Sequence, residues 1–233
     1  MAWLPTEWRS VFGGPAIVGQ CDIPIASRTS SGPSVSVFDS TNVGTRTPVP
    51  STLVLGYPLT NPLPSPFFNL ATEIRGLVVP PGTRSALFIG RLGLGPLCYG
   101  TPQECGDPTT EDNGYHAYPY VYEVWAYDLN DLLTVKNGQR RSWEIRPYTT
   151  WTIDLPFGTP AHSIKAVAFD SVSSRVFITA SSDAEHSNRP LIHVFALARS
   201  SHRVFVLSKP CVPHTAARAP SCRHSGRRCR QTP

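Results

Sequence analysis

Short apolar runs, each about one strand long, recur along the chain between turns rich in Pro, Gly, Ser and Asp. Alternation is clearest before residue 128, where Tyr122 and Val124 share one face of a strand and Glu123 takes the other. No window places apolar residues at i, i+3, i+4 and i+7 over the length of an ordinary helix. The pattern therefore predicts an all-β protein.

Two segments that lie ninety positions apart carry the same pattern of apolar and polar residues. Residues 73–90 read EIRGLVVPPGTRSALFIG, and residues 163–180 read SIKAVAFDSVSSRVFITA. Each segment predicts a β-hairpin, with a turn at Pro81 and Gly82 in the first copy and near Ser173 in the second. The continuous apolar character of the first strand predicts burial on both of its faces.

Further strands are predicted after each hairpin, and the same signature occurs once earlier in the chain. The predicted third strands are residues 34–40, 122–128 and 191–197. The predicted fourth, outer strands are residues 51–59, 149–157 and 202–208. Asp39 and Asp128 end two of the third strands, and Asp side chains favour turns. A unit of four antiparallel strands is thus predicted in residues 1–60 (incomplete), 61–160 and 161–208.

Repeated units of four short strands are typical of β-propeller blades. The segments IRGLVV, RSALFIG and VWAYD, and then IKAVAF, RVFITA and IHVFA, resemble the NHL, YVTN and kelch-like β-propellers. The stretches RTSSGPSVSVFD and YVYEVWAYDLNDLLTVKNGQ also resemble uncharacterised secreted bacterial proteins. A closed ring needs about four to eight blades. The resemblance therefore implies a partial, open β-propeller of three four-stranded antiparallel blades, and a β-sandwich of the same strands is the alternative.

The second unit carries an insert at residues 92–116. The two hairpins lie ninety positions apart, but the third strands lie only 68 apart, from Trp125 to His193, so the second unit holds 22 extra residues. Long loops on a rigid scaffold commonly carry function, and the resemblance places this loop at the mouth of the channel. The candidate ligand-binding residues are Glu73, Arg75, Arg91, Asp112 and His116. For Glu73 and Arg75, an internal ion pair or a capping role is the competing interpretation.

The cysteine pattern predicts a disulfide bond in the insert. Six residues that include Gly100 and Pro102 separate Cys98 from Cys105, so the chain can curve back to join them. Such a bond implies an oxidising compartment, and hence an extracellular or periplasmic location, although no signal peptide is recognisable. Two free thiols are one alternative. A zinc site with His116 as third ligand is the other, but the usual C-x₂₋₄-C spacing is absent.

Two segments resemble ligand-binding motifs, one a calcium loop and one a dinucleotide-binding turn, but neither fulfils the requirements of its motif. The sequence DLNDLLTVKNGQ begins like a calcium loop, but Leu132 and Leu133 occupy positions where a ligand and a glycine are required. We predict a polar turn that ends at Asn137 and Gly138 instead. The glycines between residues 90 and 95 follow a strand, but no helix is predicted after them, so a dinucleotide site is not expected.

Basic residues are concentrated at the end of the chain. The net charge is +5, but seven of the 21 Lys and Arg residues lie in residues 200–233, which contain no acidic residue. Residues 209–233 have almost no large apolar side chains, which predicts a disordered tail. The tail also lacks aromatic residues for base stacking, so no specific nucleic-acid binding is expected. No apolar run approaches the roughly 20 residues of a membrane span.

Three functional hypotheses remain. The first is a non-catalytic extracellular binding propeller that uses residues 92–116 to recognise an unidentified ligand or protein, with no catalytic residue, metal ligand or cofactor assigned. The second is a metal-assisted propeller hydrolase or lyase, for which calcium is the expected ion; it needs inward acids from several blades, but the third unit offers Lys165. The third is a truncated fragment without independent function. Open blade edges also predict self-association.

Overall fold

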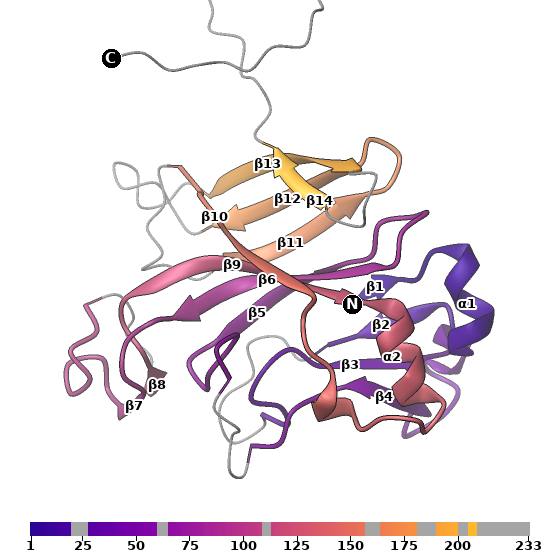
Figure 1. Cartoon of the computed structure of the whole chain (residues 1–233), viewed down its shortest axis with the longest axis horizontal. Helices are drawn as coiled ribbons and strands as arrows, with labels where there is room; N and C mark the ends of the chain where they lie inside the picture. Colours follow the sequence, from indigo (N-terminus) through magenta and orange to yellow (C-terminus); the bar gives the residue numbers. More distant parts are fainter. Residues whose placement is uncertain are drawn as a thin grey trace, which may run out of the picture.

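A computed structural model describes residues 1–19, 28–59, 65–108, 113–156, 164–180, 190–199 and 205–208. This part of the chain is all-β, as predicted, and contains three four-stranded antiparallel sheets and one two-stranded sheet. Figure 1 shows the three larger sheets stacked in chain order, from indigo at the bottom to yellow at the top. Three large sheets are one more than a β-sandwich has. The predicted tail, residues 209–233, lies outside the described residues.

The first sheet is formed by the four earliest strands in chain order. These are β1 (Ala2–Trp3), β2 (Ala16–Val18), β3 (Val35–Phe38) and β4 (Ser51–Leu55). Helix α1 (Thr6–Phe12) joins β1 to β2, and the 3₁₀ helix η2 (Ser40–Asn42) follows β3.

The second and third sheets have the same internal order, with the first strand at one edge and the last at the other. The second sheet consists of β5 (Glu73–Val78), β6 (Ser85–Gly93), β9 (Tyr120–Asp128) and β10 (Thr149–Ile153). The third consists of β11 (Ile164–Asp170), β12 (Arg175–Ala180), β13 (Leu191–Arg199) and β14 (Phe205–Ser208). Helix α2 (Leu129–Lys136) and the 3₁₀ helix η3 (Ser142–Glu144) lie between β9 and β10.

The two predicted hairpins are present and share one register. Leu77 pairs with Phe88 in the first hairpin, and Val167 pairs with Ile178 in the second, which are equivalent positions. Each hairpin also has a register shift just before these pairs, at the same point of the repeat. The turns contain a residue with positive φ, 70° at Gly82 and 53° at Ser174. The sequence repeat is therefore also a repeat in backbone pairing.

The third strands extend this correspondence. Phe88 pairs with Trp125 in the second sheet, and Ile178 pairs with His193 in the third. Trp125 and His193 are therefore equivalent, as the sequence alignment assumed. The extra residues of the second unit must then lie between β6 and β9, where the insert was predicted.

Apolar side chains fill the space on both sides of the second sheet. Phe88 and Trp125 pack against the first sheet, whereas Leu87 and Val124 pack against the third. Because neighbouring residues of a strand point to opposite faces, β6 and β9 must be apolar at nearly every position. The first strands also meet closely, since a Cβ atom added to Gly76 would lie 2.3 Å from the Cβ of Val167.

Strand β11 is an exception to the predicted burial of first strands on both faces. Lys165, Ala166 and Ala168 are exposed, whereas Val167 and Phe169 face the second sheet and are partly buried. The prediction was wrong for this strand because none of the described sheets covers its other face.

The predicted polar turn at DLNDLLTVKNGQ is instead helix α2. The side chain of Asp128 accepts a hydrogen bond from the backbone N–H of Asn130 at 2.9 Å and caps the helix, while Leu129 and Leu132 are buried. Gly138, with φ of 74°, follows its end. An eight-residue helix is too short for its period to stand out in the sequence. The helices of the described part of the chain are also too short and too polar to cross a bilayer.

Candidate functional site

The insert leaves the second sheet where β6 and β9 end their pairing, at Gly93 opposite Tyr120. The described residues of the insert, 94–108 and 113–119, contain a separate two-stranded sheet, β7 (Cys98–Gly100) and β8 (Gly114–His116). Figure 1 shows this small sheet at the opposite end of the second sheet from the helices. A Cβ atom on Gly95 would lie 1.8 Å from the carbonyl oxygen of Tyr118, so this close approach requires glycine.

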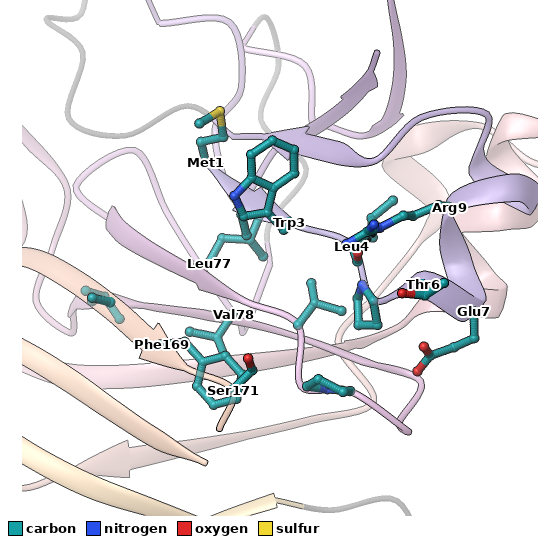
Figure 2. A pocket seen from close by; sticks show the side chains of 16 residues that line it. Met1, Trp3, Leu4, Thr6, Glu7, Arg9, Leu77, Val78, Phe169 and Ser171 are labelled. Carbon is teal, nitrogen blue, oxygen red and sulfur yellow. Dashed lines mark hydrogen bonds between the residues drawn. The ribbon is translucent and has the colours of Figure 1, made fainter. Parts of the chain in front are cut away.

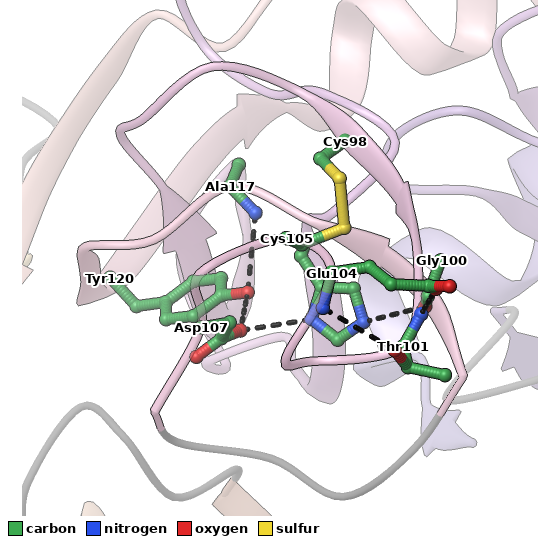
Figure 3. The surroundings of a disulfide bond; sticks show 9 residues. Cys98, Gly100, Thr101, Glu104, Cys105, Asp107, Ala117 and Tyr120 are labelled. Carbon is green, nitrogen blue, oxygen red and sulfur yellow. Dashed lines mark hydrogen bonds and ion pairs between the residues drawn. A yellow bond between two sulfur atoms is a disulfide. The ribbon is translucent and has the colours of Figure 1, made fainter.

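The predicted disulfide joins Cys98 to Cys105, with their Cα atoms 5.6 Å apart (Figure 3). Within the loop that it closes, the Glu104 carboxylate accepts a hydrogen bond from the backbone N–H of Thr101 at 2.8 Å. A zinc site needs thiolates, and these two sulfur atoms are bonded to each other. The zinc alternative for this pair is therefore wrong. Among the described residues, no cluster of three His, Cys, Asp or Glu side chains is placed to hold a metal ion.

A buried hydrogen-bonded group holds the insert together beside the disulfide. The Nδ1 atom of His116 lies 2.9 Å from a carboxylate oxygen of Asp107, and its Nε2 atom lies 3.1 Å from the carbonyl oxygen of Gly100. Because a carbonyl oxygen only accepts, Nε2 must carry a proton. Both side chains are almost fully buried, with 3% and 0% of their surfaces exposed. Buried hydrogen bonds between its own residues thus hold the insert together.

Tyr120 connects this group to the second sheet. Its hydroxyl donates to Asp107 at 2.5 Å and accepts from the backbone N–H of Ala117 at 3.2 Å (Figure 3). Burial, and then the hydrogen bond to Asp107, raise the pKa of Tyr120 to about 12. The hydroxyl therefore remains a donor at every physiological pH.

Arg91 continues the network on the other side of Tyr120. Its guanidinium lies over the Tyr120 ring, 4.1 Å from the ring centroid, and forms an ion pair with Glu73. Glu73 also forms an ion pair with Arg75, at 3.2 Å. The ion-pair interpretation of Glu73 and Arg75 is confirmed by these contacts.

Four of the five predicted binding residues therefore belong to one connected network, which runs through Arg75, Glu73, Arg91, Tyr120, Asp107 and His116. The fifth, Asp112, lies outside the described residues. Arg91, Asp107 and His116 are buried, whereas Glu73 and Arg75 are partly exposed. The contacts of the network connect the insert to the second sheet. Sequence reasoning did not select Asp107 or Tyr120, because an acid nine residues from a histidine matches no motif.

Four large apolar side chains of the insert are exposed. Leu94, Leu97, Tyr99 and Tyr118 have 58%, 46%, 63% and 45% of their surfaces exposed, and we call these four residues the insert patch. The Tyr99 ring packs edge-on against Tyr115, with their centroids 5.1 Å apart. None of the four was among the predicted binding residues, since loop sequence alone does not show which apolar side chains remain exposed.

A cavity of about 550 Å³ lies where the first strands of the three sheets converge (Figure 2). Trp3 from β1, Leu77 from β5 and Phe169 from β11 are among the residues that line it. Glu7, an acidic residue that lines the cavity, accepts a hydrogen bond from the backbone N–H of Gly82 at 2.7 Å. Glu73 does not line this cavity. The cavity and the insert patch are therefore distinct surfaces.

Comparison of the chain with protein-family models, curated proteins and solved structures found no match. The protein is therefore classified by its fold alone. It has three stacked four-stranded antiparallel sheets, and the first strands of these sheets converge. The resemblance to β-propellers stays a prediction.

Glu123, in the second sheet, provides a prediction on pH dependence. Burial raises the pKa of its carboxyl above the ordinary value, more than a hydrogen bond to Thr150 lowers it. The folded protein then keeps this proton at pH values where the unfolded chain has lost it, so stability is lost as pH rises from the ordinary value of 4.5 through the folded pKa. We expect Glu123→Gln to increase the free energy of unfolding at neutral pH and to remove this loss.

Urea denaturation of both proteins between about pH 4 and pH 8 measures this effect. Asp170→Asn is the matched control, because hydrogen bonds from Ser173 lower the pKa of Asp170 and its replacement should decrease stability at neutral pH. A Glu123→Gln protein that is less stable than the wild type at neutral pH would contradict the prediction.

Proposed function

We propose that the chain is a non-catalytic interaction module of the β-propeller type, which recognises a protein partner through the insert patch. The observation that carries this proposal is the gathering of Leu94, Leu97, Tyr99 and Tyr118, all substantially exposed, on one insert. Exposed apolar groups that cluster in this way mark interaction surfaces in soluble proteins.

The construction of the insert supports the same proposal. The Cys98–Cys105 disulfide and the buried contact between Asp107 and His116 fix the backbone that carries the patch. A rigid loop loses little conformational entropy on binding, and aromatic side chains with few rotatable bonds are effective anchors. The disulfide also supports an extracellular or periplasmic location, where such bonds persist.

The metal-assisted hydrolase or lyase is less well supported. Glu73, one of the acids that this hypothesis could use, forms ion pairs with Arg75 and Arg91. Calcium calorimetry on the purified protein distinguishes the two functions. Stoichiometric calcium binding that is lost in Glu73→Gln would favour the enzyme.

Selection of peptides from a random displayed library tests the binding proposal. We expect the wild-type protein to enrich peptides with apolar anchors, and we expect these peptides to lose binding to a Leu97→Ser, Tyr99→Ser double variant. The matched control is a Val43→Ser, Val172→Ser double variant, because these two side chains are 60% and 94% exposed but lie outside the insert.

The control should bind the enriched peptides as the wild type does, and all three proteins should have the same melting temperature. Peptides that bind the insert variant and the wild type equally would contradict the proposal. Enriched peptides that lose binding only to the control would place the recognition surface elsewhere.

A further inference from the structure

Part of the face of the third sheet that points away from the second sheet is apolar and is covered by none of the described sheets, although the next row on this face contains Asp170 and Arg175. The apolar part is formed by alternate residues of three strands, in two cross-strand rows: Ala166, Thr179 and Ile192, and then Ala168, Phe177 and Val194. Ile192 is 63% exposed, and both alanines are also exposed. We call these six residues the outer face of the third sheet.

The second sheet has the same two rows at equivalent positions. They are Gly76, Ile89 and Val124, and then Val78, Leu87 and Ala126. In the second sheet this face is buried against the third sheet, where Leu87 and Ile89 contact the core that includes Ile164 and Ile178. The third sheet therefore presents, at matching positions, the kind of face on which a further sheet packs.

The first sheet has the complementary open face. Val18 and Leu53 lie on its side away from the second sheet and are 40% and 53% exposed. The corresponding side of the second sheet carries Phe88 and Trp125, which are buried against the first sheet. We call the side that carries Val18 and Leu53 the outer face of the first sheet.

We propose that a second copy of this chain docks with the outer face of its first sheet against the outer face of the third sheet. The contact repeats the interface that already joins the first sheet to the second and the second to the third, with apolar side chains on both sides. Two copies related by a two-fold axis make this contact twice and bring together six sheets. Six is within the range of about four to eight blades that close a propeller.

This arrangement differs from the self-association through strand edges that the sequence predicted. Edge pairing would extend a sheet by hydrogen bonds at its outermost strand, whereas the proposed contact buries the faces of two sheets. Head-to-tail contacts form a closed ring only if the rotation between copies closes; otherwise they form open chains. The proposal specifies closure at two copies.

Sedimentation velocity on the purified full chain tests the proposal. The wild type is expected to have twice the chain mass of 25.5 kDa. Ile192→Glu and Leu53→Glu, one on each outer face, should each give monomers, because each buries an unpaired charge in both contacts. The controls are Val172→Glu and Val43→Glu, at exposed positions off these faces, and they should remain dimers.

Mixing the two monomeric variants identifies the geometry. In a head-to-tail ring of one Ile192→Glu chain and one Leu53→Glu chain, the first sheet of the former meets the third sheet of the latter, and both of these faces are unaltered. The mixture should therefore form a heterodimer, although neither variant dimerises alone. If Ile192→Glu is monomeric but Leu53→Glu stays dimeric, two third sheets meet each other and the proposal is wrong.

Two other results would also overturn the proposal. A wild-type protein that stays monomeric at its highest soluble concentration has no such contact. A monomeric wild type that dimerises after deletion of residues 209–233 would show that this segment occupies the face instead. Circular dichroism and melting temperatures confirm that each variant is folded before its mass is interpreted.

Discussion

Gly90→Ala is expected to disrupt the second sheet and to lower the free energy of unfolding by about 3 kcal/mol or more. A Cβ atom on Gly90 would lie 1.8 Å from the carbonyl oxygen of Glu73, on the neighbouring strand β5. A backbone oxygen cannot move aside as the end of a flexible side chain can, so β5 and β6 must separate. This separation would also displace Glu73 from Arg91, which connects the sheet to the insert.

Gly56→Ala is the matched control for this substitution. A Cβ atom on Gly56 would meet only the Leu53 side chain, at an ordinary contact distance of 3.4 Å. Removing a glycine also restricts the unfolded chain, so we expect a change of less than about 1 kcal/mol. Urea denaturation of the three proteins measures the difference. A Gly90→Ala protein as stable as Gly56→Ala would show that β5 and β6 do not approach this closely.

The parts of the fold that the sequence predicted are those that local periodicity and repetition determine. Alternation identified the strands, and the ninety-residue repeat identified the two hairpins and their shared register. Once the hairpins were aligned, the shorter interval from Trp125 to His193 located the insert. The spacing of Cys98 and Cys105 was compatible with a local bond, and the structure contains that bond.

The parts that the sequence did not predict depend on packing between distant segments. Helix α2 has only eight residues, and its buried Leu129 and Leu132 contribute to a core shared with the first sheet. The exposure of Ala166 and Ala168 depends on the lack of a covering sheet among the described residues. The sequence of a strand does not show whether another sheet covers its second face.

The sequence likewise predicted some features of the candidate site and not others. The sequence selected Glu73, Arg91 and His116 as charged groups near the insert, but it did not reveal that Tyr120 joins them. It also assigned recognition to charged residues, whereas the large apolar side chains that the insert exposes, such as Tyr99, were not selected. The difference is one of burial: the charged side chains lie inside and hold the insert in place, whereas apolar side chains such as Tyr99 are exposed to solvent.

Asp107→Asn is expected to release the insert from the second sheet while the three large sheets remain folded. The substitution removes the negative charge that faces His116 and accepts from Tyr120, in a site where Asp107 has no exposed surface. Leaving a buried hydrogen-bonding group without its partner costs about 1–3 kcal/mol, because the loss of its contact with water is no longer offset. The loss is local, since these contacts hold residues 94–119 and not the sheets.

Hydrogen exchange measures this local effect. In Asp107→Asn, amide protection should fall at Ala117, whose N–H donates to Tyr120, and should be retained at Val124 in the centre of β9. Glu104→Gln is the matched control, since its carboxyl is exposed in the same insert and only accepts from Thr101. Its exchange pattern should match that of the wild type.

The coupling between Asp107 and His116 can be isolated by combining Asp107→Asn with His116→Gln. If the two side chains act as one charged pair, the double variant should lose less protection than the sum of the two single losses. Peptides that bind the insert patch should also lose affinity for Asp107→Asn, although none of the patch residues is altered. Additive losses, or unchanged protection at Ala117, would show that the insert is held by the Cys98–Cys105 disulfide alone.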